Sequence, residues 1–503
     1  MMIHSTVEQF KQLDRRISHY QDIVSLINWD AAVTAPRKGI PLMAEAKGTL
    51  AAELFQLTTS EQMKNCLEAL SDPLVWEQLD ALTQATIRQY RRRMDKTAAV
   101  PVKLYEQYVV HAAKTQLIWE EAKEKNSFAL YHPALARMVE LAIELGQAYE
   151  VGDHPYDGFL DQYEPGLTVK ALDPLFSRLQ SATGELLGRI GQARKSFAED
   201  VFLQSYPVAR QRELIRVLLT KLGYDWDAGR VDESAHAFAA AMNTGDVRVA
   251  VRIVEHDLRR AIFSTIHECG HAFYELGIDP ALEGSVLRGT ASMAIDESQS
   301  RYWENFIGRS PEFWHFFLRE VKKLFGSQLE ALTPEDVYNS INQVQPGAIR
   351  VGSDEVTYNL HIIVRYELEK ALLTGEITVK ELPGLWNEQM QSHLGVTPET
   401  DAQGVLQDSH WACGEFGYFP SYALGNMYAA QFHHTLKQQK PKLGEGIKQG
   451  DFGSIREWFA QNVHRHGRLY TPSEIIERVT GEALNTEYLI RYLEQKYTGI
   501  YQM

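Results

Sequence analysis

TIHECGHAFYELG, residues 265–277, places His267 and His271 four positions apart. On an α-helix this spacing directs both imidazoles from one face, one turn apart. Two neutral imidazoles in this arrangement can bind a divalent metal, and zinc is the usual occupant. Glu268 directly follows the first histidine, so its carboxylate can reach a water molecule at the metal without binding the metal itself. The stretch therefore predicts a hydrolytic zinc helix with Glu268 as general base.

The residues around the motif favour a buried helix over an exposed one that carries two ordinary histidines. Ile262, Phe263, Ile266 and Phe273 recur with the period of an amphipathic helix. Cys269 lies inside the motif but faces away from the ligand side, so we expect it to be a small packing residue.

A hydrolytic zinc site needs a third protein ligand and one open coordination position. Glu297 is the candidate, in the sequence ASMAIDESQSRYWENF at residues 291–306. Ile295, Tyr302 and Phe306 recur at helical spacing, which predicts a second helix that crosses the first. Asp296 competes for the role, but neighbours on a helix point about 100° apart, so only one of the two carboxylates can face the metal. Spacing alone leaves open that both carboxylates are merely solvated.

The rest of the chain predicts a mainly α fold with one exception. Val247, Val249, Val251 and Ile253 alternate with polar or small residues after an Asn-Thr-Gly-Asp turn, which is the period of a strand. Two arginines on its other face suggest the edge of a small sheet beside the zinc helix. With no fixed-period repeat and no long linker, we expect one unit over residues 1–503, with a helical part at about 1–230 and a catalytic part at about 231–503.

Composition narrows the class of protein. The chain has 503 residues and 51 basic against 66 acidic side chains, so its net charge is −15. This balance argues against nucleic acid and anionic membrane surfaces as partners. The N-terminus lacks a secretory pattern, and no window approaches the apolar run of about 20 residues that spans a bilayer. Three distant cysteines, without metal-type spacing, fit a reduced cytoplasmic protein.

Six short motifs in order resemble the carboxypeptidase Taq family of thermostable metallocarboxypeptidases. The family signatures are HPF, DxRxT, HExxH, HE[SG]Q, [IV]RxxAD and GxxQDxHW. Here they read His236-Ala237-Phe238, Asp246 to Ala250, His267 to His271, Asp296 to Gln299, Ile349 to Asp354, and Gly404 to Trp411. The resemblance implies a large helical zincin-type peptidase with a deep cleft.

The chain departs from the signatures at four positions. Ala237, Ala250, Ser353 and Asp296 stand where the family has Pro, Thr, Ala and His. The resemblance puts the metal on His267, His271 and Glu297, all of which are intact, but a carboxylate at 296 changes the charge beside the site. We therefore expect Asp296→His to raise turnover or zinc retention.

The resemblance also implies the residues that bind the substrate and stabilise the reaction. Arg350, in the [IV]RxxAD signature, is the first candidate to hold the C-terminal carboxylate of a peptide, and Arg248 on the strand is the second, because arginine suits bidentate carboxylate binding. Asp354 and Asp408 would orient these arginines or His410. By analogy with other glutamate-type zinc peptidases, His410 and Tyr418 are the candidate donors to the oxyanion; for Tyr418 the alternative is a core packing role.

The sequence as a whole predicts a zinc-dependent metallocarboxypeptidase that releases C-terminal amino acids from peptides with broad specificity. One zinc ion per chain is expected, with Co²⁺ as a substitute, and the resemblance implies a homodimer. Two alternatives stay open. A zinc oligopeptidase or dipeptidase would share the metal site without a carboxylate clamp, and a catalytically weakened peptide-binding homologue would explain Asp296, although the intact Glu268 weighs against it.

Overall fold

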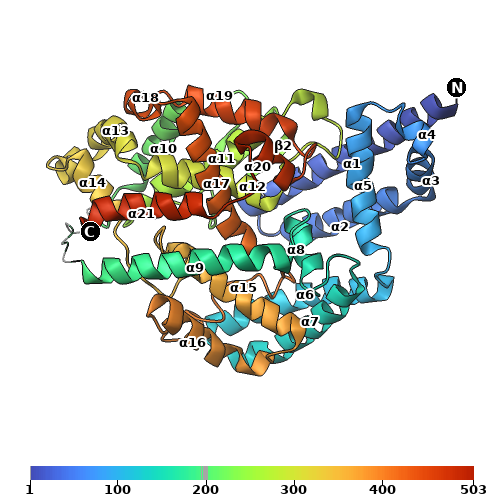
Figure 1. The fold of residues 1–503 in the computed structure, drawn as a ribbon, viewed down its shortest axis with the longest axis horizontal. Helices are drawn as coiled ribbons and strands as arrows, with labels where there is room; N and C mark the ends of the chain where they lie inside the picture. Colours follow the sequence, from blue (N-terminus) through green and yellow to red (C-terminus); the bar gives the residue numbers. More distant parts are fainter. Residues whose placement is uncertain (1, 194, 196, 198–201) are drawn as a thin grey trace.

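Long helices make up most of the protein (Figure 1). The computed structural model describes residues 2–193, 195, 197 and 202–503. The described residues of the first part form α1 (Met2–Val33), α2 (Ile40–Thr59), α3 (Glu61–Leu70), α4 (Pro73–Trp76), α5 (Ala81–Thr97), α6 (Val102–Glu124), α7 (Phe128–Ala148), α8 (Asp157–Tyr163), α9 (Val169–Gln192) and α10 (Val208–Leu222). Many of these helices begin at a polar cap: the side chains of Ser60, Asp72, Asp80 and Thr168 each accept a hydrogen bond from a backbone N–H of the first turn.

A three-stranded sheet follows, in the order β1-β3-β2. It consists of β1 (Val231–Glu233), β2 (Phe238–Asn243) and β3 (Asp246–Val251). β2 and β3 are antiparallel, with Phe238 opposite Ala250, and β1 adds to β3 in parallel, with Val231 opposite Val249. The predicted strand and its position beside the histidine helix are therefore confirmed. The prediction that this strand, β3, lies at the edge of the sheet was wrong: β3 is the central strand, because β1 pairs with its other side. β1 has only three residues, too few to give a pattern in the sequence.

Helices return for the remainder of the chain. They are α11 (Leu258–Leu276), α12 (Met293–Arg301), α13 (Pro311–Leu329), α14 (Pro334–Ile341), α15 (Tyr358–Thr374), α16 (Leu382–Leu394), α17 (Pro420–Gln439), α18 (Leu443–Gln449), α19 (Gly453–Asn462), α20 (Pro472–Thr480) and α21 (Glu487–Tyr501). Short 3₁₀ turns lie at Pro280–Leu282, Arg350–Gly352, Val379–Glu381 and His464–His466, and a π-helix, η2, continues α12 over Tyr302–Gly308. This mainly helical architecture confirms the predicted fold class.

The main hydrophobic core surrounds α11, α12, α15 and α17, which are buried in the middle of the molecule (Figure 1). A smaller cluster joins α1, α3 and α5 through Phe10, Leu67 and Ile87, and it is closed by Val286 from the loop before α12. C-terminal α21 runs beside α9, so late and early segments of the chain pack together. The histidine helix thus lies deep in the fold, with the sheet on one side and α12 on another.

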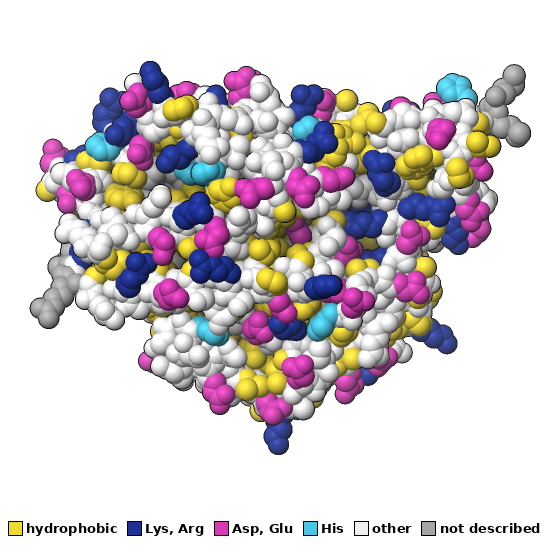
Figure 2. All heavy atoms as spheres, in the orientation of Figure 1, with side chains coloured by type: hydrophobic (Ala, Val, Ile, Leu, Met, Phe, Trp, Pro, Cys, Tyr) yellow, Lys and Arg dark blue, Asp and Glu magenta, His cyan; other side chains and the backbone are white. Residues whose placement is uncertain are grey.

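The surface carries charges of both signs over the face drawn in Figure 2. Within the described residues, no helix combines the length and the apolar character needed to cross a lipid bilayer.

Candidate metal centre and active site

α11 presents the two predicted histidines on one face, as their spacing requires. Its N-cap, Asp257, accepts a hydrogen bond from the backbone N–H of Arg259, and its apolar side, with Ile262 and Ile266, is buried. The imidazole rings of His267 and His271 lie with centroids 5.1 Å apart. Both side chains remain partly exposed, and His267 lines a cavity of about 610 Å³.

Glu297, on α12, completes a group of three metal-binding side chains. Its Oε2 atom lies 3.7 Å from His267 Nε2 and 3.6 Å from His271 Nε2. In the described part of the chain, this is the only cluster of three or more His, Cys, Asp or Glu side chains close enough to share a metal ion. Ligands at the usual zinc distances in a tetrahedral site lie about 3.3–3.6 Å from one another. The two imidazoles and the carboxylate therefore fit a divalent metal.

Two glycines allow the helices that carry these ligands to approach closely. A Cβ atom at Gly270 of α11 would lie 2.5 Å from the carbonyl oxygen of Gln299 on α12. A Cβ atom at Gly425 of α17 would lie 2.6 Å from Cγ of Glu297 itself. Because α12 is held between two side-chain-free positions, the backbone packing fixes how far Glu297 extends toward the histidines.

Each ligand histidine contacts a second carboxylate through its other ring nitrogen. His267 Nδ1 lies 3.0 Å from Glu304 Oε2, and His271 Nδ1 lies 3.1 Å from Asp296 Oδ1. The hydrogen bond to Glu304 fixes the tautomer of His267 and increases its basicity as a metal ligand, whereas Asp296, whose Oδ1 makes no hydrogen bond, acts on His271 through its charge. Asp296, the departure from the family signature, is thus placed to support His271, while Glu297 alone reaches the metal position, as the helix geometry predicted.

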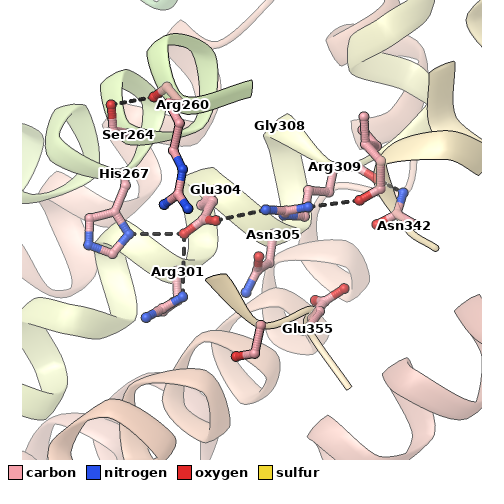
Figure 3. A network of polar contacts seen from close by, with 12 residues as sticks. Arg260, Ser264, His267, Arg301, Glu304, Asn305, Gly308, Arg309, Asn342 and Glu355 are labelled. Carbon is pink, nitrogen blue, oxygen red and sulfur yellow. Dashed lines mark hydrogen bonds and ion pairs between the residues drawn. The ribbon is translucent and has the colours of Figure 1, made fainter. Parts of the chain in front are cut away.

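Arginines surround the acidic groups of the site (Figure 3). Arg301 Nε donates to Glu297 Oε1 at 2.6 Å, and Arg309 Nη2 donates to the other oxygen of Glu304 at 3.1 Å. Burial alone would raise the pKa of Glu304, but His267, Arg301 and Arg309 hold it well below its usual range. Burial is likewise outweighed at Glu297, whose pKa is lowered by Arg301 and the two histidines. Both carboxylates are therefore kept ionised.

Glu268 lines the same cavity as His267 and Glu297 but is not part of the three-ligand cluster. Its side chain is buried, and burial raises the pKa of its carboxyl group. A carboxylate with a raised pKa, placed beside the metal position without binding there, suits a general base.

Arg350 also lines this cavity, from the 3₁₀ turn that precedes α15. Its Nε and Nη2 atoms donate to Asp408 Oδ1 at 3.1 and 2.8 Å, and Nη1 donates to the hydroxyl of Tyr358 at 3.1 Å. The other oxygen of Asp408 accepts a bond from the fully buried Arg365 at 2.7 Å. Burial would raise the pKa of Asp408, yet Arg365 and Arg350 hold it far below its usual range. The guanidinium of Arg350 is thus fixed in place with N–H groups left for a ligand.

His410 and Tyr418 lie together, one layer behind the cavity wall. The centroid of the His410 ring lies 4.2 Å from that of Phe419 and 5.3 Å from that of Tyr418. Burial lowers the pKa of His410 to about 4. His410 Nε2 lies 3.3 Å from the hydroxyl of Tyr422, which lines the cavity. The cavity lining includes neither His410 nor Tyr418.

Arg248 is not brought to this cavity. It forms a bidentate pair with Asp246, at 2.8 and 2.7 Å, and its guanidinium lies 5.9 Å from the ring of Trp29 on α1. Asp354 also differs from its predicted orienting role, because it accepts bonds from the backbone N–H groups of Gln345, Val356 and Thr357. Asp354 therefore stabilises the turn that immediately precedes α15.

Four residues of the site were not singled out in the sequence: Arg301, Glu304, Tyr358 and Tyr422. For the first two a signal existed, because Arg301 and Glu304 follow Glu297 by four and seven positions, the spacing of one helix face. The two tyrosines carried no such signal, since aromatic residues at helical spacing are usually core.

Comparisons with known proteins agree with this geometry. A family model described as carboxypeptidase Taq (M32) metallopeptidase matches residues 9–497. Carboxypeptidase 1 of Bacillus subtilis (strain 168) is 42% identical over 504 residues, and Thermostable carboxypeptidase 1 of Thermus thermophilus is 36% identical over 511 residues, each with 100% of both chains covered. The crystal structure of the M32 carboxypeptidase from Deinococcus radiodurans R1 matches with a TM-score of 0.95 at 31% identity, covering 99% of this chain and 100% of that one. The chain therefore belongs to the carboxypeptidase Taq (M32) family, and it is a metallocarboxypeptidase, a peptide hydrolase.

Proposed function

We propose that the protein is a zinc-dependent carboxypeptidase that releases single C-terminal residues from peptides with broad specificity. One observation carries this proposal: His267, Glu297, Glu268 and Arg350 line one cavity of about 610 Å³. A metal position, a base and a fixed cation for a carboxylate thus open onto the same space.

Zinc is the proposed metal because two imidazole nitrogens and one carboxylate oxygen form a usual catalytic zinc set with an open position. His267, His271 and Glu297 would hold it, and Co²⁺ would substitute in the same donor set. When bound, a zinc ion supplies Lewis acidity that polarises a carbonyl group and lowers the pKa of water. Glu304, hydrogen-bonded to the far nitrogen of His267, would keep Nε2 of that ring directed at this position, and Asp296 would support His271 through its charge.

Glu268 is the proposed general base. Its carboxylate would accept the proton of the attacking water and deliver it to the leaving amine, and the raised pKa helps it hold the proton between these two transfers. Burial of Glu268 also excludes competing solvent from the transfer.

Arg350 is the proposed binder of the substrate's terminal carboxylate. Asp408 and Tyr358 occupy one side of its guanidinium, so the remaining N–H groups are oriented before the substrate arrives. Arg248 remains a weaker candidate because its partner is Asp246.

The developing oxyanion needs hydrogen-bond donors. Tyr422 is the proposed donor on the cavity wall, because it lines the cavity and its hydroxyl lies 3.3 Å from His410 Nε2; His410 and Tyr418, behind that wall, stay predictions in this role. Broad specificity is supported by the mixed wall of the cavity, which combines Phe263 and Ile341 with polar Gln343 and Gln345. The homodimer, the cytoplasmic location and the single unit over residues 1–503 stay predictions.

The test measures bound metal and C-terminal residue release together, for the wild-type protein and Glu268→Ala. We expect equal metal content in both proteins and a loss of turnover of about 10²–10⁴-fold in the variant. A wild-type protein that binds metal but releases no C-terminal residue would reject the proposed activity and would still support the metal site.

An oligopeptidase is the competing function. It would cleave C-terminally amidated peptides as fast as free acids, whereas the proposed role of Arg350 requires a free carboxylate. Arg350→Met should raise KM for free-acid peptides more strongly than it lowers kcat, since the lost contact is made in the bound substrate too.

A further inference from the structure

Residues of α5, of the end of α8 and of the start of α12 line a second cavity, of about 310 Å³. Four cationic side chains line it, against a single carboxylate, that of Asp161; the cations are Arg92, Arg93, Lys96 and Arg468. We call these four residues the basic cluster. In the view of Figure 2, Lys and Arg side chains gather on the right, where α1 and α5 lie.

Asp161 balances only part of the charge of the basic cluster. It pairs with Arg92 at 3.0 Å and with Lys96 at 3.6 Å. Within the described residues, no carboxylate lies within ion-pair distance of Arg93 or Arg468, and the carboxylates that act on them at longer range are Asp14 and Glu275. Arg93 is exposed to solvent, so a ligand can reach it.

Arg468 is held in the cavity wall by backbone groups. Its guanidinium donates to the carbonyl oxygens of Thr290 at 3.1 Å and Val286 at 3.3 Å, which carry no full charge. It passes so close to Gly289 that a Cβ atom there would lie 2.8 Å from its Cζ. Burial, and then the neighbouring Arg93, lower the pKa of Arg468 to about 10, and burial lowers that of Lys96 to about 8. Cations crowded in this way are stabilised by an anion.

The basic cluster is linked to the metal position through α12. Met293 lines the second cavity and begins α12, the helix that carries Glu297 four residues later. Tyr163, also in this lining, contacts Tyr418 at 4.9 Å between ring centroids, and Tyr418 contacts Tyr422 at 5.3 Å. Tyr422 lines the first cavity. Three tyrosine rings in contact thus link the linings of the two cavities.

From this arrangement we infer that the basic cluster binds an acidic side chain of the peptide substrate, upstream of the bond that is cleaved. The inference rests on the proposed function, because Arg350 fixes the direction in which the peptide lies. Four residues of α12 rise about 6 Å, and an extended peptide advances about 3.3–3.6 Å per residue. The favoured acidic residue therefore lies about two positions before the cleaved bond.

The negative net charge of the protein restricts the binding of an acidic side chain to the basic cluster. With −15 overall, the chain repels acidic peptides at long range, so only a local concentration of cations in a concave site can hold one. Glu or Asp is the expected side chain, because arginine and lysine together provide several N–H donors for a carboxylate.

The experiment compares blocked pentapeptides that end in the same neutral residue and carry Glu, Gln or Lys at the second or third position before the cleaved bond. The kcat/KM of C-terminal release is measured for the wild-type protein, Arg93→Gln and the control Arg88→Gln. Arg88 lies on the same helix, is exposed and stacks on Trp76 outside the cavity. Binding of the same peptides to Glu268→Ala, followed by calorimetry, gives the preference without turnover.

We expect the wild-type protein and Arg88→Gln to favour Glu over Lys by about tenfold, the effect of one to two partly solvated charge pairs. Arg93→Gln should reduce the ratio to about threefold or less, and 0.5 M salt should reduce it in all three proteins. Equal kcat/KM and equal binding for Glu and Lys peptides in the wild-type protein would overturn the inference, as would a ratio unchanged in Arg93→Gln. Neither result would affect the proposed function, which fails only if no peptide releases its C-terminal residue.

Discussion

Glu304 offers the sharpest test of how the metal site is built, through the substitution Glu304→Gln. The wild-type carboxylate is 3.0 Å from Nδ1 of His267 and also pairs with Arg301 and Arg309. Glutamine keeps the shape and one acceptor oxygen but removes the negative charge that makes the imidazole a stronger ligand. Changes of this kind lower metal affinity by about 10–100-fold, which is about 1.4–2.7 kcal/mol. Because an acceptor is retained, we expect the lower end of this range.

The assay is a competition titration of Zn²⁺ and Co²⁺ against a chelator of known affinity, at fixed pH and ionic strength. Glu335→Gln, an exposed position on α14, is the matched control and should bind both metals like the wild-type protein. A metal Kd for Glu304→Gln within twofold of the wild-type value would refute the reasoning.

A loss of stability must be separated from a loss of ligand support. Glu304→Gln leaves two buried guanidinium groups with fewer partners, and breaking a buried ion pair costs about 3–5 kcal/mol of unfolding free energy. Arg309→Met removes the same ion pair but leaves Glu304 beside His267. It should therefore lower Tm without weakening metal binding. If both variants lost metal affinity equally, the contact with His267 would not be the cause.

Three further predictions follow from the same geometry. Asp296→Asn should lower metal affinity by about tenfold, because His271 loses its charged partner, and the chelator competition above measures it. Gly425→Ala should destabilise the protein by about 1–3 kcal/mol and reduce metal occupancy, since its Cβ atom would meet Glu297; denaturant unfolding and metal analysis check both, and an unchanged midpoint would contradict the close packing. Burial raises the pKa of Glu369 from 4.5 to about 7, so the stability that its protonated form contributes is lost as the pH rises through this window. The Tm of the wild-type protein relative to Glu369→Gln should accordingly fall between pH 5 and pH 8, and a constant difference would reject the shift.

Much of the ligand set could be predicted from the sequence, because helix periodicity turns spacing into direction. The four-residue interval between His267 and His271 placed both rings on one face, and the angle between neighbours separated Asp296 from Glu297. The structure brings the three predicted ligands within metal-binding distance of one another. The same logic predicted that Cys269 is buried and away from the site.

Contacts between distant segments could not be predicted in this way. Tyr422 and Arg350 meet across 72 positions of the chain at a ring-to-cation distance of 4.8 Å, and no local pattern encodes such a contact. Arg248 had the right charge and a plausible motif, but its side chain lies on the sheet face toward Trp29. The glycines at 270 and 425 carried no signal either, since a glycine inside a helix is informative only when the helix that crosses it is known.

The π-helix that continues α12 makes the site sensitive to the length of the chain as well as to its composition. Over Tyr302–Gly308 the backbone takes in more residues per turn than an α-helix does. A one-residue deletion within this segment would let it continue as an ordinary α-helix, which changes the direction of the side chains inside the segment relative to those of α12. Deleting Tyr302 or Trp303 would thus turn Glu304 away from the imidazole of His267, although every residue that contacts the metal position remained in the sequence. The deletion of one residue, with all three metal ligands unchanged, could therefore weaken or abolish metal binding.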